Sequence, residues 1–167
     1  MLSQSRINQI EALVREVLTT LDPNLEKIKA PISLWQIMKN FQITLKTGQF
    51  EDSTVSGAYN KKDKTIFVEK EEPYTRKMFT IAHELGHYFL HEDKKAEFFY
   101  RAQVLKLDDE KSAEEQEANW FAASLLMPEV LIRYFWELTN DPDQLSIIFG
   151  VSPTAVFYRL KNLHLMA

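Results

Sequence analysis

Two histidines and a glutamate occur within five consecutive residues near the middle of the chain, in the run His83-Glu84-Leu85-Gly86-His87. In a helix, residues four apart lie on the same face, so both imidazoles can bind one metal ion. Glu84 would project beside them, where its carboxylate can take a proton from a water molecule that attacks a peptide carbonyl. The pattern therefore predicts a zinc centre for peptide hydrolysis, with His83 and His87 as ligands and Glu84 as the general base.

The segment that carries this pattern is predicted to be a helix from about residue 75 to residue 90. The alternative is a surface helix that contains two histidines and a glutamate by chance. The side chains around the pattern are mostly apolar: Phe79, Ile81, Ala82, Leu85, Tyr88, Phe89 and Leu90. They indicate a buried helix, in which ionisable groups without partners are costly. A bound metal ion would offset that cost, which favours the metal site over the surface helix.

A catalytic zinc site usually has three protein ligands and one open position, so a third ligand is expected. His91 follows His87 by another four residues, but three ligands in line along a straight helix cannot converge on one ion. Sites with three histidines use a glycine to turn the chain before the third histidine, but here Leu90 stands in the place of that glycine and Asp93 in the place of the third histidine. We therefore expect His91 to form hydrogen bonds at the end of the helix.

The next predicted helix, from Ser112 to Pro128, begins with several acidic residues that could supply the third ligand. Glu115 is the favoured ligand, and Asn119 lies on the same face, where it could orient a histidine. The alternative for Glu115 is a capping box with Ser112, which its spacing fits equally well. Glu117 is the second choice as ligand, and its alternative is an ordinary exposed carboxylate.

Hydrophobic periodicity and turn residues predict the elements that position these side chains. They are an amphipathic helix from about Ile7 to Leu21, a short helix from Ser33 to Asn40, extended segments at 41–45, 55–59 and 65–68, helices at 112–128 and 128–138, and two short helices after Asp141 and Ser152. We expect an α+β fold in which residues 1–167 form a single, mainly helical domain. The extended segments would form a small antiparallel sheet beside the metal helix, and residues 141–167 a C-terminal helical appendage. The strand at 65–68 could also pair with an extended substrate along the edge of the cleft.

Composition narrows the classes of function. The 167 residues carry a formal net charge of −4 and no cysteine. An acidic chain does not attract nucleic acid or an anionic membrane surface, so a protein partner is favoured and nucleic acid is not expected. Without cysteine there can be no disulfide, and a metal site must use histidine and carboxylate, which fits a cytoplasmic location. We expect neither a secretory signal nor a membrane span.

The sequence from about Ile7 to Leu165 resembles the ImmA/IrrE family of metallopeptidases. The resemblance is strongest in two segments, Phe79–His91 and Glu115–Pro128. Weaker similarity occurs at 55–57, 149–152 and 158–160. It implies a gluzincin-like site in which His83, His87 and Glu115 bind zinc. It also implies that the substrate is a helix-turn-helix repressor of a mobile element or a stress response, here encoded as a separate polypeptide.

Two other classes of function compete with the peptidase. The C-terminal helices have helix-turn-helix proportions, which would suit a DNA-binding regulator, but from Asp141 onward two acidic residues balance two basic ones. A pair of helices that simply pack through Leu145, Ile148, Val156, Phe157 and Leu160 is favoured instead. The other alternative is a zinc-stabilised binding module without catalysis. Glu84 argues against it, because a structural zinc ion has no use for a general base beside it.

Overall fold

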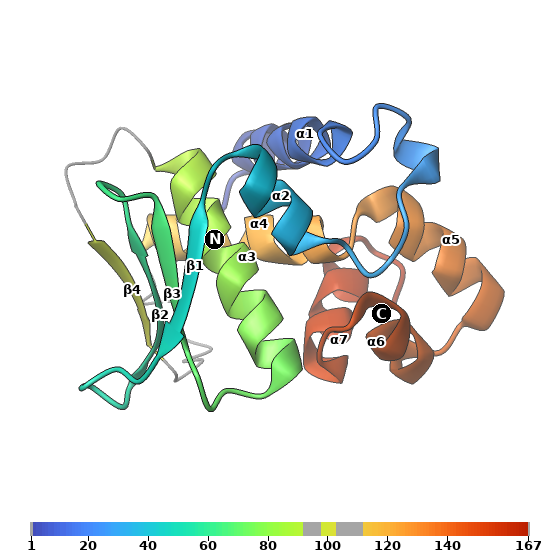
Figure 1. Ribbon diagram of the computed structural model, residues 1–167. Coiled ribbons are helices and arrows are strands. Elements are labelled where there is room, and N and C mark those ends of the chain that lie inside the picture. The colour runs from blue at the N-terminus through green and yellow to red at the C-terminus, as the bar shows by residue number, and fades with distance from the viewer. Residues whose placement is uncertain (1, 92–97, 103–111, 167) are drawn as a thin grey trace.

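The computed structural model describes residues 2–91, 98–102 and 112–166, with residues 98–102 described by their backbone alone (Figure 1). It has a mainly helical α+β fold, as predicted. In chain order the elements are α1 (Gln4–Thr19), the 3-10 helix η1 (Leu25–Lys27), α2 (Leu34–Asn40), β1 (Thr44–Gly48), β2 (Val55–Asn60), β3 (Thr65–Glu69), α3 (Tyr74–Leu90), β4 (Phe98–Ala102), α4 (Ala113–Leu126), α5 (Glu129–Thr139), α6 (Pro142–Phe149) and α7 (Pro153–Asn162).

The predicted helix boundaries are confirmed where a polar side chain caps the helix. The Ser33 hydroxyl accepts a hydrogen bond of 3.2 Å from the backbone N–H of Gln36 at the start of α2. At the start of α4, the Ser112 hydroxyl accepts one of 3.3 Å from the backbone N–H of Glu115. Gly150 ends α6 with a φ of 64°, a left-handed conformation that favours glycine. Local sequence signals therefore set these ends.

The four strands form one mixed sheet in the order β1-β3-β2-β4. The predicted antiparallel arrangement is correct for β2 with β3 and for β2 with β4. It is wrong for β1, which pairs in parallel with β3, so that Thr44 lies opposite Thr65. The reason is that β3 turns back on β2 and offers its other side to β1, so β1 and β2 are not neighbours. The expectation that the strand at 65–68 pairs with an extended substrate along the edge of the cleft is also wrong, because β3 already has a strand on each side.

Helix α3 occupies the middle of the fold, where it contacts β2 and β3 on one side and α4 on another. Figure 1 shows the sheet beside α3 and the group α5, α6 and α7 at the other end of the molecule. Ile81 and Leu85 of α3 are buried and belong to the same hydrophobic core as Phe121 and Leu125 of α4. Burial of this kind fixes the relative position of the two helices.

The C-terminal helices join this core rather than standing apart from it. Leu145, Val156 and Leu160 are buried, as predicted, and belong to the same cluster. Phe157 was expected in the same contact but is 41% exposed, because it lies on the outer face of α7. Arg159, one of the two basic residues of this segment, is 1% exposed and forms an ion pair of 2.8 Å with Glu11 of α1.

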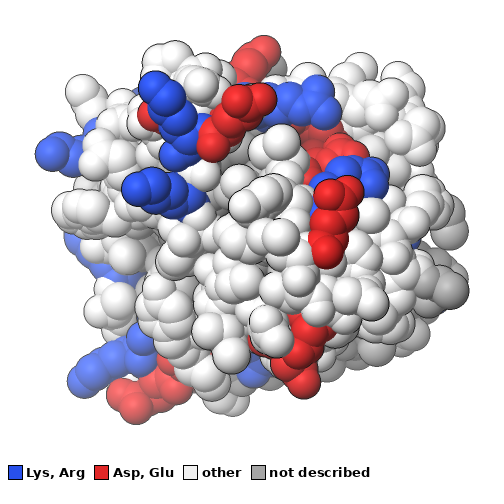
Figure 2. Space-filling model, turned by 90° about the vertical axis from the view of Figure 1, so that its right-hand side faces the viewer, with Lys and Arg blue, Asp and Glu red and all other residues white. Residues whose placement is uncertain are grey.

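The surface over α5, α6 and α7 carries both charged and exposed hydrophobic side chains. Figure 2 shows basic and acidic side chains interspersed on this face, with uncharged areas between them. Large hydrophobic side chains are exposed on these helices, including Tyr134 at 57%, Leu138 at 64% and Ile147 at 81%. Among the described helices, none combines the length and the apolar character that a membrane crossing requires.

Candidate metal centre

The central turns of α3 carry three of the predicted site residues. His83 and Glu84 are 0% exposed and His87 is 1% exposed. The apolar residues Ala82 and Leu85 flank His83 and Glu84 and are buried in the core. The predicted burial of this helix is therefore confirmed, and its ionisable side chains lie inside the protein.

Helix α4 brings a carboxylate to the two histidines. An oxygen of Glu115 lies 3.3 Å from Nε2 of His83, and its other oxygen lies 3.1 Å from Nε2 of His87. The two Nε2 atoms are 3.1 Å apart. One donor atom from each of the three residues falls within 4.8 Å of the other two, which makes them a group that could hold a metal ion.

The donor set and its spacing fit zinc. Two imidazole nitrogens and a carboxylate oxygen are ordinary zinc ligands. Bonds of about 2.0–2.1 Å at a tetrahedral angle place neighbouring donor atoms about 3.3 Å apart, close to the separations found here. Glu115 is the most exposed member of the group, with 31% of its side chain accessible, so the site opens toward solvent on that side.

Hydrogen bonds behind the histidines determine which ring nitrogen carries a hydrogen. Nδ1 of His83 lies 3.0 Å from Oδ1 of Asn119, an acceptor, so Nδ1–H donates and Nε2 keeps its lone pair. Nε2 of His91 lies 3.0 Å from the Glu117 carboxylate and donates to it in the same way. Nδ1 of His91 therefore accepts from Nδ1–H of His87 at 2.9 Å. Both Nε2 lone pairs then face the Glu115 carboxylate, an arrangement of three acceptors that a cation would stabilise.

Glu115 is ionised in this setting. Burial alone would raise the pKa of its carboxyl group, but hydrogen bonds and charge interactions with His83 and His87, which act when these rings are protonated, lower that pKa well below its ordinary value. The capping alternative and the ligand alternative for this residue turn out to be compatible. Ser112 is bonded by the backbone N–H of Glu115, which leaves the carboxylate available to the histidines.

Glu117, the second choice as ligand, lies outside the metal-binding group. Its carboxylate accepts hydrogen bonds from Nε and Nη2 of Arg6 at 2.8 and 2.7 Å and one from His91 at 3.0 Å. The bonds from Arg6 are the main cause that lowers the pKa of Glu117. The predicted hydrogen-bonding role of His91 at the helix end agrees with these contacts.

Gly57 of β2 is a part of the site for which sequence reasoning gave only a weak signal. A Cβ atom at this position would lie 2.3 Å from Cγ2 of Thr80 and 3.2 Å from Oε1 of Glu84. A residue larger than glycine fits only if the side chain of Thr80 shifts. The strand therefore packs directly over the Glu84 carboxylate because Gly57 has no side chain.

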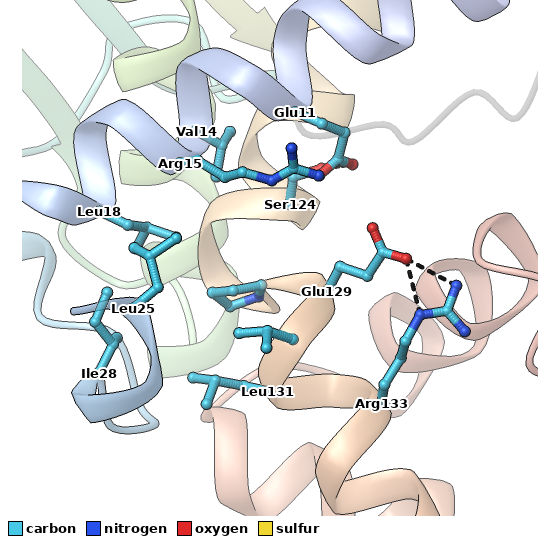
Figure 3. Close-up of a pocket in the computed structure, with 12 residues that line it drawn as sticks. Glu11, Val14, Arg15, Leu18, Leu25, Ile28, Ser124, Glu129, Leu131 and Arg133 are labelled. Atoms are coloured by element: carbon cyan, nitrogen blue, oxygen red, sulfur yellow. Dashed lines mark hydrogen bonds and ion pairs between the residues drawn. The ribbon is translucent and has the colours of Figure 1, made fainter. Parts of the chain in front are cut away.

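A pocket of about 300 Å³ lies elsewhere, between α1, η1 and the start of α5 (Figure 3). Leu18 and Ile28 are among its apolar walls, and an ion pair of 2.8 Å joins Glu129 and Arg133 on the other side. None of its described lining residues belongs to the group around His83. The candidate metal centre and this pocket are therefore separate.

Comparisons with known proteins agree with the geometry. The chain is 29% identical over 105 residues to an uncharacterised immunity region protein of Bacillus phage phi105, and the match covers 63% of each chain. In fold it is similar to a Mycobacterium tuberculosis transcriptional regulator, with a TM-score of 0.63, 21% identity and coverage of 95% of this chain and 47% of that one. The chain thus spans less than two thirds of both relatives. The model of peptidase family M78, described as the IrrE N-terminal-like domain, matches residues 38–161, and the protein belongs to this family.

Proposed function

We propose that this protein is a zinc-dependent endopeptidase in which His83, His87 and Glu115 hold the metal ion. The observation that carries the proposal is the convergence of their three donor atoms within 4.8 Å. The outer hydrogen bonds from His83 to Asn119 and from His87 to His91 support it, because they turn both Nε2 lone pairs inward. Membership of the peptidase family supports it independently.

When bound, zinc would supply a Lewis acid that lowers the pKa of water and polarises the peptide carbonyl. Glu84 is the proposed general base, since it follows His83 directly and lies buried beside the group. Its carboxylate accepts a proton from the attacking water as the new bond to the carbonyl carbon forms. It then delivers that proton to the amine nitrogen as the C–N bond breaks. The buried setting of α3 keeps competing water away from this carboxylate.

The substrate that we propose is a separately encoded repressor protein of the helix-turn-helix type. The resemblance to ImmA/IrrE peptidases supports this substrate, and so does the similarity to a protein from the immunity region of a phage. The acidic net charge of −4 favours a protein partner over nucleic acid. A chain without cysteine suits the cytoplasm, where such a repressor would act.

The variant Glu84→Gln tests the catalytic part of the proposal. It keeps the size and polarity of the side chain but removes its ability to accept a proton. Expressed in a host cell, the wild-type protein should create new N-termini in one or a few proteins, as detected by mass spectrometry. The variant should bind zinc with the same stoichiometry but cleave at least about 100-fold more slowly. Equal cleavage by both proteins would overturn the proposed role of Glu84.

A further inference from the structure

A chain of hydrogen bonds connects the first helix to the candidate metal centre. Arg6 of α1 binds both oxygens of the Glu117 carboxylate, at 2.8 and 2.7 Å. Glu117 accepts from Nε2 of His91 at 3.0 Å, and Nδ1 of His91 lies 2.9 Å from Nδ1 of His87. The contact between Arg6 and Glu117 spans 111 positions of sequence and joins α1 to α4.

The residues of this hydrogen-bond series become more buried toward the candidate metal centre. The side chain of Arg6 is 33% exposed, that of Glu117 is 14% exposed and that of His91 is 1% exposed. An exposed ion pair contributes little to stability, since water screens it. A bidentate contact between a guanidinium and a carboxylate, at the end of a buried series of hydrogen bonds, instead fixes the orientation of the carboxylate.

Each hydrogen bond of this series determines which ring nitrogen of the next histidine carries its hydrogen. Both oxygens of the Glu117 carboxylate accept from the Arg6 guanidinium, which holds the carboxylate in place as an acceptor for His91. His91 then has its hydrogen on Nε2 and a lone pair on Nδ1. That lone pair requires the hydrogen of His87 to be on Nδ1, which leaves Nε2 of His87 with a lone pair directed at Glu115. Without this series of hydrogen bonds, His87 could hold its hydrogen on Nε2, where it would block metal binding.

We propose that Arg6 is a positioning residue for the metal centre, acting through Glu117 and His91, so that docking of α1 and metal binding stabilise each other. This inference rests on the proposed function, because it takes His87 as a ligand. It goes beyond that function by assigning a role in metal affinity to Arg6, near the start of α1. Arg6 is 81 positions from His87 and forms no part of the group that could hold the ion.

The test measures zinc affinity of the full chain by competition with a chromogenic chelator. His91→Phe, which keeps an aromatic ring but removes the acceptor, should weaken zinc binding about 10–100-fold. Arg6→Ala should weaken it about tenfold, near the lower end of that range. Arg6→Lys keeps the charge but loses the bidentate contact, and should fall between wild type and Arg6→Ala. Arg15→Ala is the control, since Arg15 is an exposed arginine of the same helix.

The double variant separates this role from a general loss of stability. If Arg6 acts through His91, adding Arg6→Ala to His91→Phe should cost almost no further affinity. An arginine that merely stabilises the fold would give additive effects. Circular dichroism of each metal-free variant confirms that it is folded before zinc is added, and Arg6→Lys remains informative if Arg6→Ala does not fold.

A second measurement needs neither zinc nor activity. Nitrogen-15 NMR of the histidine rings in the metal-free protein should find the His87 hydrogen on Nδ1 in the wild type and partly on Nε2 in His91→Phe. A wild-type His87 with its hydrogen on Nε2 would overturn the inference. So would zinc affinities of Arg6→Ala and His91→Phe equal to that of a wild type that binds zinc. A wild type that binds no zinc would instead overturn the proposed function.

Discussion

Gly86 of α3 packs directly against Ala118 of α4. A Cβ atom at Gly86 would lie 3.0 Å from the Cα atom and 3.1 Å from the carbonyl oxygen of Ala118. The contact lies next to the candidate metal centre, because Gly86 precedes His87 and Ala118 precedes Asn119. Two small residues thus let the helix with the histidines approach the helix with the carboxylate.

Gly86→Ala should therefore weaken the metal site. In an exposed helix this substitution stabilises by about 1 kcal/mol, since alanine forms helix better than glycine. Here the new methyl group meets backbone atoms, which cannot move aside as a side chain can. We expect a lower melting temperature and weaker zinc binding, measured by thermal unfolding with and without zinc. Gly48→Ala is the matched control, because a Cβ at Gly48 has no described atom within 4 Å. A more stable Gly86→Ala variant with unchanged zinc affinity would contradict the packing argument.

Asn119 should contribute to zinc affinity through the amide oxygen that it offers to His83. Asn119→Leu has a similar volume but no acceptor, so we expect zinc to bind about 10–100-fold more weakly. Asn119→Asp keeps an oxygen acceptor and should stay much closer to the wild type. Isothermal titration of metal-free protein with zinc measures both. Equal affinities for the leucine and aspartate variants would show that the hydrogen bond to His83 has no influence.

The buried pair of Glu11 and Arg159 should make stability depend on pH. Arg159 donates to Glu11 at 2.8 Å, and Trp120 and Ser124 donate to the same oxygen at 2.9 and 2.6 Å. Burial raises the pKa of Glu11, but these partners outweigh it and hold that pKa below the ordinary value of 4.5. A lowered carboxyl pKa gives stability that is present above the unfolded value and is lost as pH falls through the folded one.

Glu11→Gln leaves the Arg159 charge buried without a counter-charge, so at pH 7 it should cost about 3–5 kcal/mol of unfolding free energy. The difference between wild type and variant should shrink as the pH falls below about 4.5, where Glu11 of the unfolded chain becomes protonated. Urea unfolding of both proteins at pH 7 and at pH 4 measures this. A difference that stays constant over this interval would contradict the assigned role of the pair.

Much of the fold could be predicted because its signals are local. The spacing of His83 and His87 on an apolar helix indicates a shared face, and Ser33 and Ser112 mark helix starts by their own chemistry. The parallel pairing of β1 with β3 has no such signal. It depends on which strand fills the place beside β3, and that is settled by contacts between segments far apart in the sequence.

The candidate site was predictable in its helices but not in all its contacts. Glu115 and Glu117 stand two residues apart on the same acidic helix turn, so spacing alone could not decide which one meets the histidines. Which of the two glutamates meets His83 and His87 depends on α1, because Arg6 binds Glu117 and holds it against His91. The burial of Arg159 could not be predicted from the local sequence either, because its partner Glu11 lies 148 positions away.

Zinc titration of the wild type and of three alanine variants tests the proposed centre most directly. The metal-free wild type should bind one zinc ion per chain. His83→Ala and Glu115→Ala should lose that binding, whereas Glu117→Ala should weaken it by no more than about 100-fold, since Glu117 acts only through His91. A Glu115→Ala variant that binds zinc as tightly as the wild type, or a Glu117→Ala variant that alone loses the ion, would contradict the proposed ligand set.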